Sequence, residues 1–172
     1  MASRRTFIQI GIGGAALFAI ARLGASAFAA SGPSYRVLDE RSAGMVKALA
    51  PVVMGNALPP DAAARERAVN AIVVSFDRGV SCLPAVVKKE ISDLFAFLDF
   101  APTRVAFAGL WSPVAESPPE ELAAFLTRWR NSRFELQQAS YQALAQLIHA
   151  SWYDMQEAWT AISYPGPPPL PR

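Results

Sequence analysis

Apolar residues recur every three or four positions through most of this chain, and this helical period constrains the fold more than any other feature. The clearest example follows Pro84, where one helix face would carry Val87, Ile91, Leu94, Phe95 and Leu98. Pro84 suits the first position of a helix because no intrahelical N–H is needed there. No segment shows the period-two alternation of a half-buried strand. We therefore expect an all-α fold, an irregular bundle of about five helices around one core.

Two earlier segments show the same period. Asp39 is placed to cap a helix over residues 40–53, and Pro51 is expected to kink its last turn. A turn over residues 55–61 separates it from a second helix over residues 61–79. The expected buried faces of these two helices are Met45, Val46, Leu49 and Val53 in the first, and Val69, Ile72, Val73 and Phe76 in the second.

Residues 99–117 break the period and contain Pro102, Gly109 and Pro113. Prolines and glycines without a helical pattern are typical of irregular structure. We therefore expect a long ordered loop here, with Trp111 exposed or docked on a neighbour.

A fourth helix is predicted to begin at the sequence Ser117-Pro118-Pro119-Glu120, which has the form of a capping box with proline in the first turn. Asn131 and Ser132 are expected to separate it from a fifth helix that runs to about Trp152. The expected buried faces are Leu122, Phe125, Leu126 and Trp129 in the fourth helix, and Phe134, Tyr141, Leu144, Ile148 and Trp152 in the fifth. A short helical turn around residues 157–159 would precede an extended, Pro-rich tail over residues 163–172.

The beginning of the chain has the composition of an export signal. Arg4 and Arg5 precede Phe7 and an apolar run, and the small residues Ala27 and Ala29 suit a signal peptidase. Two adjacent arginines followed by a Phe indicate the twin-arginine version of this signal. The alternative, that the arginines only orient a membrane helix, requires neither their adjacency nor the Phe.

We expect cleavage after Ala29 and therefore three parts of the chain. These are an export signal over residues 1–29, a single helical domain over residues 30–162 and the tail over residues 163–172. An uncleaved N-terminal segment that stays in the membrane as an anchor is the alternative. The expected location is the periplasm.

Charge and composition exclude several classes of function. Three of the 16 Lys and Arg lie in the signal and all 14 Asp and Glu lie beyond it, so the remaining chain has a formal charge of −1. We expect no nucleic-acid partner, because such binding needs a basic surface that neutralises phosphates. Cys82 is the only cysteine, which excludes an internal disulfide, a cysteine-held iron–sulfur cluster and a Cys-rich zinc site. We expect its thiol to be buried, with a bridge to a partner chain as the alternative.

No catalytic or metal-binding constellation is visible. His149 is the only histidine and lies among apolar residues, which favours a packed or capped side chain over a ligand. The adjacent Glu120 and Glu121 are expected to stabilise a helix start rather than to perform acid–base chemistry. Trp129 and Trp152 fall on buried faces. Trp111 and the pair Trp159 and Tyr164 do not, so these are the candidates for a partner interface.

Three features together resemble a known family: the twin-arginine start, LDERSAGMVKALAPVVMGNALP at 38–59, and FLTRWRNSRFELQQASYQALAQLIHASWYDMQEAWTAISYPGP at 125–167. The pattern is similar to the small subunit of membrane-bound FAD-dependent dehydrogenases, the gluconate 2-dehydrogenase third-subunit family. It is a pattern of apolar, Trp and Tyr-Pro-Gly-Pro positions that contains no catalytic motif.

The resemblance implies a non-catalytic subunit without a cofactor of its own. Such a subunit accompanies a large FAD-containing dehydrogenase of the glucose-methanol-choline type through the twin-arginine translocase and stays bound to it. The complex would lie on the periplasmic side of the inner membrane, with a multihaem cytochrome c as a third subunit that holds haem c. Arg4 and Arg5 would then be the shared export signal, and Trp159, Tyr164, Pro165 and Pro167 would lie in the matching tail.

Two other functions stay open from the residues alone. One is a stand-alone periplasmic helical module that binds a small ligand among its aromatic residues. The other is an enzyme in its own right, which the residues favour least because a single His without a placed partner gives no acid–base pair.

Overall fold

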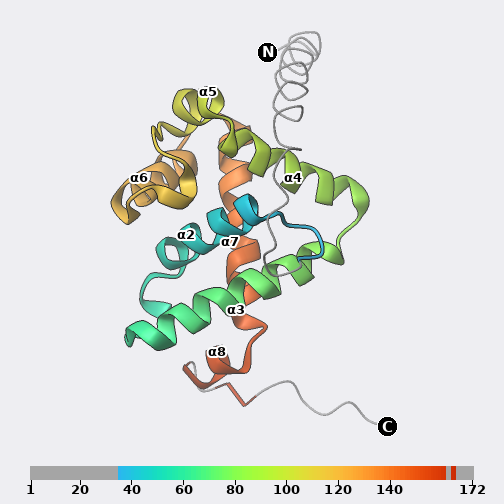
Figure 1. Cartoon of the computed structure of the whole chain (residues 1–172), viewed down its shortest axis with the longest axis vertical. Coiled ribbons are helices and arrows are strands. Elements are labelled where there is room, and N and C mark those ends of the chain that lie inside the picture. The colour runs from blue at the N-terminus through green and yellow to red at the C-terminus, as the bar shows by residue number, and fades with distance from the viewer. Residues whose placement is uncertain (1–34, 162–163, 166–172) are drawn as a thin grey trace.

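Helices make up the regular structure of this protein (Figure 1). The computed structural model describes residues 35–161 and 164–165, and these contain seven α-helices and no strand. The helices are α2 (Glu40–Met54), α3 (Ala62–Ser81), α4 (Ala85–Asp99), α5 (Ala101–Thr103), α6 (Pro119–Arg130), α7 (Glu135–Tyr153) and α8 (Gln156–Ala161). Shorter helical turns are η1 (Gly55–Ala57), the π-helical η2 (Arg104–Ala108) and the 3₁₀ turn η3 (Val114–Glu116). The expected all-α fold is confirmed.

The predicted export signal lies outside the described residues. This applies to Arg4, Arg5, Phe7, Ala27 and Ala29, and also to Pro167 of the tail.

Helix α2 is the central element of the packing. It contacts α3, α4, α6, α7 and η3, while α7 packs against α3, α6 and α8 (Figure 1). Asp39 caps α2 as expected, because its carboxylate accepts a hydrogen bond from the Ser42 N–H at 2.8 Å. Asp61 caps α3 in the same way through the Ala64 N–H at 2.8 Å. Both acids therefore fix helix starts.

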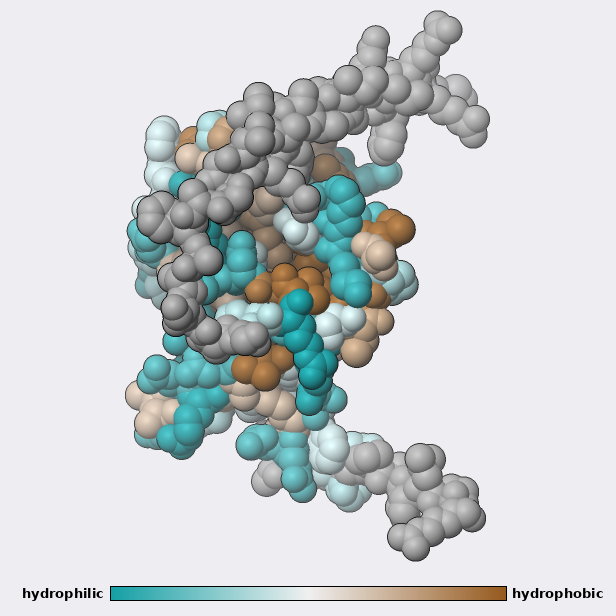
Figure 2. Space-filling view, turned by 45° about the vertical axis from the view of Figure 1, so that its right-hand side comes forward, coloured by the Kyte–Doolittle hydropathy of each residue, from teal (hydrophilic) through white to brown (hydrophobic). Residues whose placement is uncertain are grey.

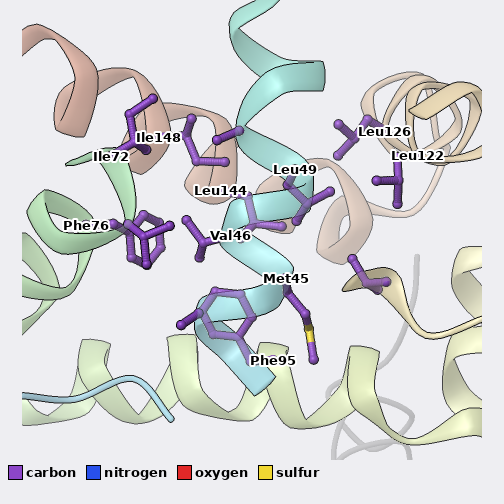
Figure 3. Packing of buried hydrophobic residues seen from close by; sticks show 14 of the residues in the cluster. Met45, Val46, Leu49, Ile72, Phe76, Phe95, Leu122, Leu126, Leu144 and Ile148 are labelled. Carbon is purple, nitrogen blue, oxygen red and sulfur yellow. The ribbon is translucent and has the colours of Figure 1, made fainter. Parts of the chain in front are cut away.

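Five helices supply most of the core (Figure 3). The labelled residues are Met45, Val46 and Leu49 from α2, Ile72 and Phe76 from α3, Phe95 from α4, Leu122 and Leu126 from α6, and Leu144 and Ile148 from α7. Phe76 and Phe95 pack edge to face with ring centroids 6.1 Å apart. The expected buried faces of α2, α3, α4 and α6 are thus confirmed in their main residues, and Trp129 and Trp152 are buried as expected.

The expectation of a long loop over residues 99–117 is wrong in its first half. Helix α5 and the π-helical η2 form continuous helical structure from Ala101 to Ala108. Pro102 lies in the first turn, where its missing N–H costs nothing. Gly109, with a φ of 65°, ends the helix in the left-handed region. The residues that seemed to interrupt a helix therefore begin and end one.

The predicted capping box before α6 is also wrong. The Ser117 hydroxyl donates to the Pro113 carbonyl at 3.0 Å and closes the preceding turn, so it does not cap α6. Pro118 occupies the cap position, and Pro119 is the first helical residue. Neither proline has an N–H, so fewer free donors need a capping oxygen.

Two single residues also differ from expectation. Phe134 was expected on the buried face of the fifth helix, but it precedes α7 and is 56% exposed. Cys82 was expected to be buried, but it follows the last residue of α3 at the turn towards α4 and its side chain is exposed. Phe134 lies just before the first residue of α7 and Cys82 just after the last residue of α3, so the helical period does not set which way either side chain faces.

Within residues 35–161 and 164–165, no helix is both long enough and apolar enough to cross a bilayer.

Candidate partner-binding surfaces

Trp111 is presented to solvent by a backbone that is held on both sides. Its side chain is 82% exposed, whereas Leu110 before it and Val114 after it are buried. The Arg104 guanidinium donates from Nη2 to the Trp111 carbonyl at 3.4 Å. A large aromatic side chain exposed on an ordered backbone is typical of an interface residue.

Trp159 and Tyr164 pack against each other. Their rings meet edge to face with centroids 5.8 Å apart, and the Tyr164 N–H donates to the Trp159 carbonyl at 2.9 Å. The Trp159 indole N–H donates to the Tyr153 carbonyl at 2.7 Å, and its half-buried ring packs against the core. Tyr164 and Pro165 remain exposed. These contacts explain both aromatic residues as the packing of α8 against the end of α7.

The structure does not bring the two predicted interface regions together. Helix α5 and the chain that follows it lie at one end of the molecule, and α8 lies at the other (Figure 1). Helix α7 runs between these ends, and its 19 residues correspond to a length of about 28 Å. Trp111 and the Trp159–Tyr164 pair are therefore parts of two separate surfaces.

A buried arginine, Arg104, holds the backbone around Trp111. The sequence pattern does not predict that this arginine is buried. Arg104 is only 5% exposed, and it donates from Nη1 to the Asp99 carbonyl at 2.7 Å. Its Nε is buried without a hydrogen-bond partner in the described structure. By contacting the Asp99 and Trp111 carbonyls, the guanidinium ties the end of α4 to the chain beyond η2.

Helices α6 and α7 hold the C-terminal carbonyls of η2. The Phe107 carbonyl accepts from the Trp129 indole N–H at 3.1 Å and from the Gln137 amide at 3.4 Å. The Ala108 carbonyl accepts from the Arg128 guanidinium. The last carbonyls of a helix have no partner within the helix. In η2, side chains from α6 and α7 donate the missing hydrogen bonds.

Exposed apolar residues surround these hydrogen bonds. Phe107 is 55% exposed, with its ring 5.3 Å from the Phe97 ring between centroids, and Leu136 near the start of α7 is 77% exposed. With Phe134 they place three apolar side chains where η2 meets the α6–α7 turn. The sequence pattern predicts none of the three as a surface residue. The break at Asn131 and Ser132 was the available signal for Phe134, since a residue between two helices belongs to neither buried face.

Other surfaces give weaker candidates. Figure 2 brings another side of the molecule forward and shows apolar residues among hydrophilic ones in the middle of that face. Scattered apolar exposure of this kind is normal. A pocket of about 70 Å³ between the start of α2 and α4 is lined by residues that include Asp39, Ser42 and Ser92. Known ligand pockets have volumes of about 300–1,000 Å³, so this one is too small for a typical cofactor or substrate.

Asp77 is the one described carboxylate with three backbone donors. The N–H groups of Arg36, Val37 and Leu38 donate to it at 2.8, 2.9 and 2.9 Å. Burial by itself raises the pKa of Asp77, but the three N–H groups and the Arg36 charge outweigh it and the pKa is lowered. This carboxylate attaches the first described residues to α3.

The remaining sequence candidates for chemistry are dispersed. His149 is exposed, and its Nδ1 lies 2.6 Å from the Ala145 carbonyl. No group of three or more His, Cys, Asp or Glu residues that could hold a metal occurs within residues 35–161 and 164–165. Glu120 and Glu121 lie in the first turn of α6, where their charge suits the helix dipole.

Comparisons with known proteins found no match, whether with models of protein families, with curated proteins or with solved structures.

Proposed function

We propose that this chain is a non-catalytic small subunit that accompanies a folded FAD-dependent dehydrogenase through twin-arginine export. The dehydrogenase would be of the glucose-methanol-choline type and would keep this chain as a structural subunit in the periplasm. A multihaem cytochrome c would receive its electrons. FAD and haem c would belong to these partners and not to this chain.

The single observation that carries the proposal is the sequence Ser-Arg-Arg-Thr-Phe at residues 3–7, ahead of a small helical domain. The twin-arginine pathway transports folded proteins, and a subunit bound to a folded partner can supply the signal for both. The resemblance of residues 38–59 and 125–167 to dehydrogenase small subunits supports the same role.

The geometry of the helical domain is compatible with a binding role. Trp111 is 82% exposed on a backbone fixed by Arg104, so the chain offers a preformed aromatic contact. The described pocket of about 70 Å³ gives no support to the alternative of a stand-alone ligand-binding module.

The test is a change of both signal arginines in the organism that encodes the chain. The double substitution Arg4→Lys and Arg5→Lys keeps the charge but removes the paired arginines. We expect FAD-dependent dehydrogenase activity to leave the periplasmic fraction and to accumulate in the cytoplasm together with this chain. The measurement is dye-coupled dehydrogenase activity in the two fractions.

Arg22→Lys is the matched control, because it changes an arginine of the same segment without touching the pair. It should leave both proteins in the periplasm. If the double variant is retained while the dehydrogenase is still exported and active, the role in export is excluded.

A further inference from the structure

One end of the molecule combines exposed apolar side chains with arginines. We name it the aromatic-arginine surface and define it by Phe107 from η2 and by four residues around the α6–α7 turn: Arg130, Arg133, Phe134 and Leu136. Interfaces between proteins are enriched in aromatic residues and arginine, so this composition differs from that of ordinary surface.

Hydrogen bonds join the two parts of this surface. The Gln137 amide, one residue beyond Leu136, donates to the Phe107 carbonyl at 3.4 Å. The Ser132 hydroxyl accepts from the Phe134 N–H at 3.1 Å and lies 2.5 Å from the Gln137 side-chain oxygen. Phe107 and Phe134 therefore belong to one continuous region, although 27 residues separate them in the sequence.

Several contacts hold the backbone and rings of this surface in place. Trp129 is buried, and its indole N–H fixes the Phe107 carbonyl from below at 3.1 Å. The Phe107 ring packs on Phe97, and the Arg133 guanidinium lies 5.1 Å from the centre of the Phe134 ring. A preformed surface of this kind loses little conformational entropy on binding.

Its charge is not neutralised within the described structure. Neither Arg130 nor Arg133 forms an ion pair with any residue of 35–161 or 164–165. Arg128 donates to a neutral carbonyl and so keeps its charge, and Glu135 is the one acid in this turn. A partner surface that pairs with these arginines must itself be acidic.

A membrane fits these observations less well than a protein. Clusters that bind anionic lipids typically hold about four to eight Lys or Arg. This surface holds two arginines with Glu135 beside them, and the chain beyond the signal has a formal charge of −1.

A second copy of this chain also fits less well. A two-fold dimer through this surface would place each set of arginines against the same set. Like charges facing each other are unfavourable, so the surface is not complementary to itself.

We propose that the aromatic-arginine surface binds an acidic, apolar surface on the FAD-dependent dehydrogenase. This inference rests on the proposed function and names the contact through which the subunit stays attached. The apolar side chains supply buried area at the centre, and Arg130 and Arg133 supply orientation and specificity.

The experiment uses the flavoprotein that co-purifies with the wild-type chain. Tagged flavoprotein is co-expressed with each variant, and the amount of this chain recovered per flavoprotein is measured at low and at high salt. We expect Arg130→Glu with Arg133→Glu to reduce recovery at least about tenfold. We expect Phe134→Ser with Leu136→Ser to reduce it at least about fivefold at both salt concentrations.

Matched controls lie on other faces. Lys47→Glu with Arg67→Glu makes the same change of charge at exposed positions of α2 and α3. Val74→Ser with Val86→Ser removes two apolar side chains that are 60% and 70% exposed. Both control variants should be recovered as the wild type is. Circular dichroism of each variant checks that the helical fold is retained.

Each outcome decides a different question. If the variants of the aromatic-arginine surface are recovered as well as their controls, the inference is overturned but the proposed function stays intact. A wild-type chain that recovers no flavoprotein contradicts the proposed function, and the inference is rejected with it. If these variants still bind the flavoprotein but no longer bind phosphatidylglycerol vesicles, the surface binds lipid instead. If they still bind the flavoprotein but change from dimer to monomer, the surface binds a second copy of this chain.

Discussion

Asp77 determines how the first described residues attach to the domain. Its carboxylate accepts three backbone N–H groups, and no neutral side chain of the same size can replace all three contacts. The segment 36–38 directly precedes the cap of α2. Loss of this carboxylate should therefore weaken the start of the central helix as well as the segment itself.

Asp77→Asn should lower the free energy of unfolding by about 1–3 kcal/mol at neutral pH, because a buried N–H group loses its acceptor. The difference from wild type should depend on pH with a defined sign. The pKa of Asp77 is lowered by folding, so its contribution is complete above the ordinary value of 3.8 and is lost as pH falls through the lower folded-state value. Urea unfolding at a series of pH values measures this.

Glu66→Gln is the control for Asp77, since Glu66 is exposed on the same helix. It should change stability little at any pH. A difference between wild type and Asp77→Asn that stays constant down to acidic pH would show that the negative charge is not the source of the effect.

Gly109 ends the π-helical η2 where only a residue without a side chain fits easily. Its φ is 65°, and an added Cβ would lie 2.8 Å from Arg128 Nη2. Gly109→Ala should therefore cost about 1–2 kcal/mol, from the left-handed backbone and from displacement of Arg128 off the Ala108 carbonyl. Thermal unfolding followed by circular dichroism measures the loss.

Gly79→Ala makes the same chemical change inside α3, where an added Cβ meets no atom within 4 Å. It should stabilise the protein by about 0.5–1 kcal/mol, because alanine is the better helix former. Destabilisation of similar size at both positions would argue against the strained conformation of Gly109.

The connection between η2 and α6 depends on side chains that reach free carbonyls. Arg128→Ala removes the donor to the Ala108 carbonyl and should destabilise η2 locally by about 1 kcal/mol. Amide hydrogen exchange over residues 104–111 should then be about fivefold faster, while exchange in α2 stays unchanged. Mass spectrometry of exchanged peptides measures both segments.

Arg130→Ala is the control, because Arg130 lies in the same last turn of α6 and its side chain makes no hydrogen bond in the described structure. It should leave exchange over residues 104–111 as in wild type. Equal acceleration in the two variants would mean that helix charge, and not the bond to Ala108, protects this segment.

The helices that the sequence predicted well are those whose packing is regular. Apolar period, together with the start signals at Asp39, Pro84 and Pro118-Pro119, located α2, α3, α4 and α6 and most of their buried residues, since each of these helices buries one continuous face. It failed from residue 101 to 108, where Pro102 and Gly109 were interpreted as interruptions although they mark the two ends of a helical segment.

The candidate interface could be predicted in part. Trp111 was selected because it follows no buried stripe, and its side chain is exposed. Phe107 and Phe134 were missed, since their exposure depends on where η2 and the α6–α7 turn meet. The burial of Arg104 could not be predicted either, because its carbonyl partners at Asp99 and Trp111 are brought together only by the fold.

The arrangement of the two ends bears on how a partner attaches. Helix α5 and the chain that follows it, which includes Phe107 and Trp111, lie at one end, and α8, which includes Trp159, lies at the other (Figure 1). The aromatic pair at the α8 end already makes internal contacts, whereas the apolar residues at the α5 end are exposed. The α5 end is therefore the better candidate for a permanent contact.

We propose that this chain acts through a flavin-containing partner and has no reactive centre of its own. Purification of the tagged chain from the membranes of its native organism, with mass spectrometry and an absorption spectrum, tests it most directly. We predict a complex in which a large second chain holds the flavin, while this chain separated from it is colourless and inactive. A flavin or haem bound to the separated chain, or dehydrogenase activity without a second chain, would contradict the account.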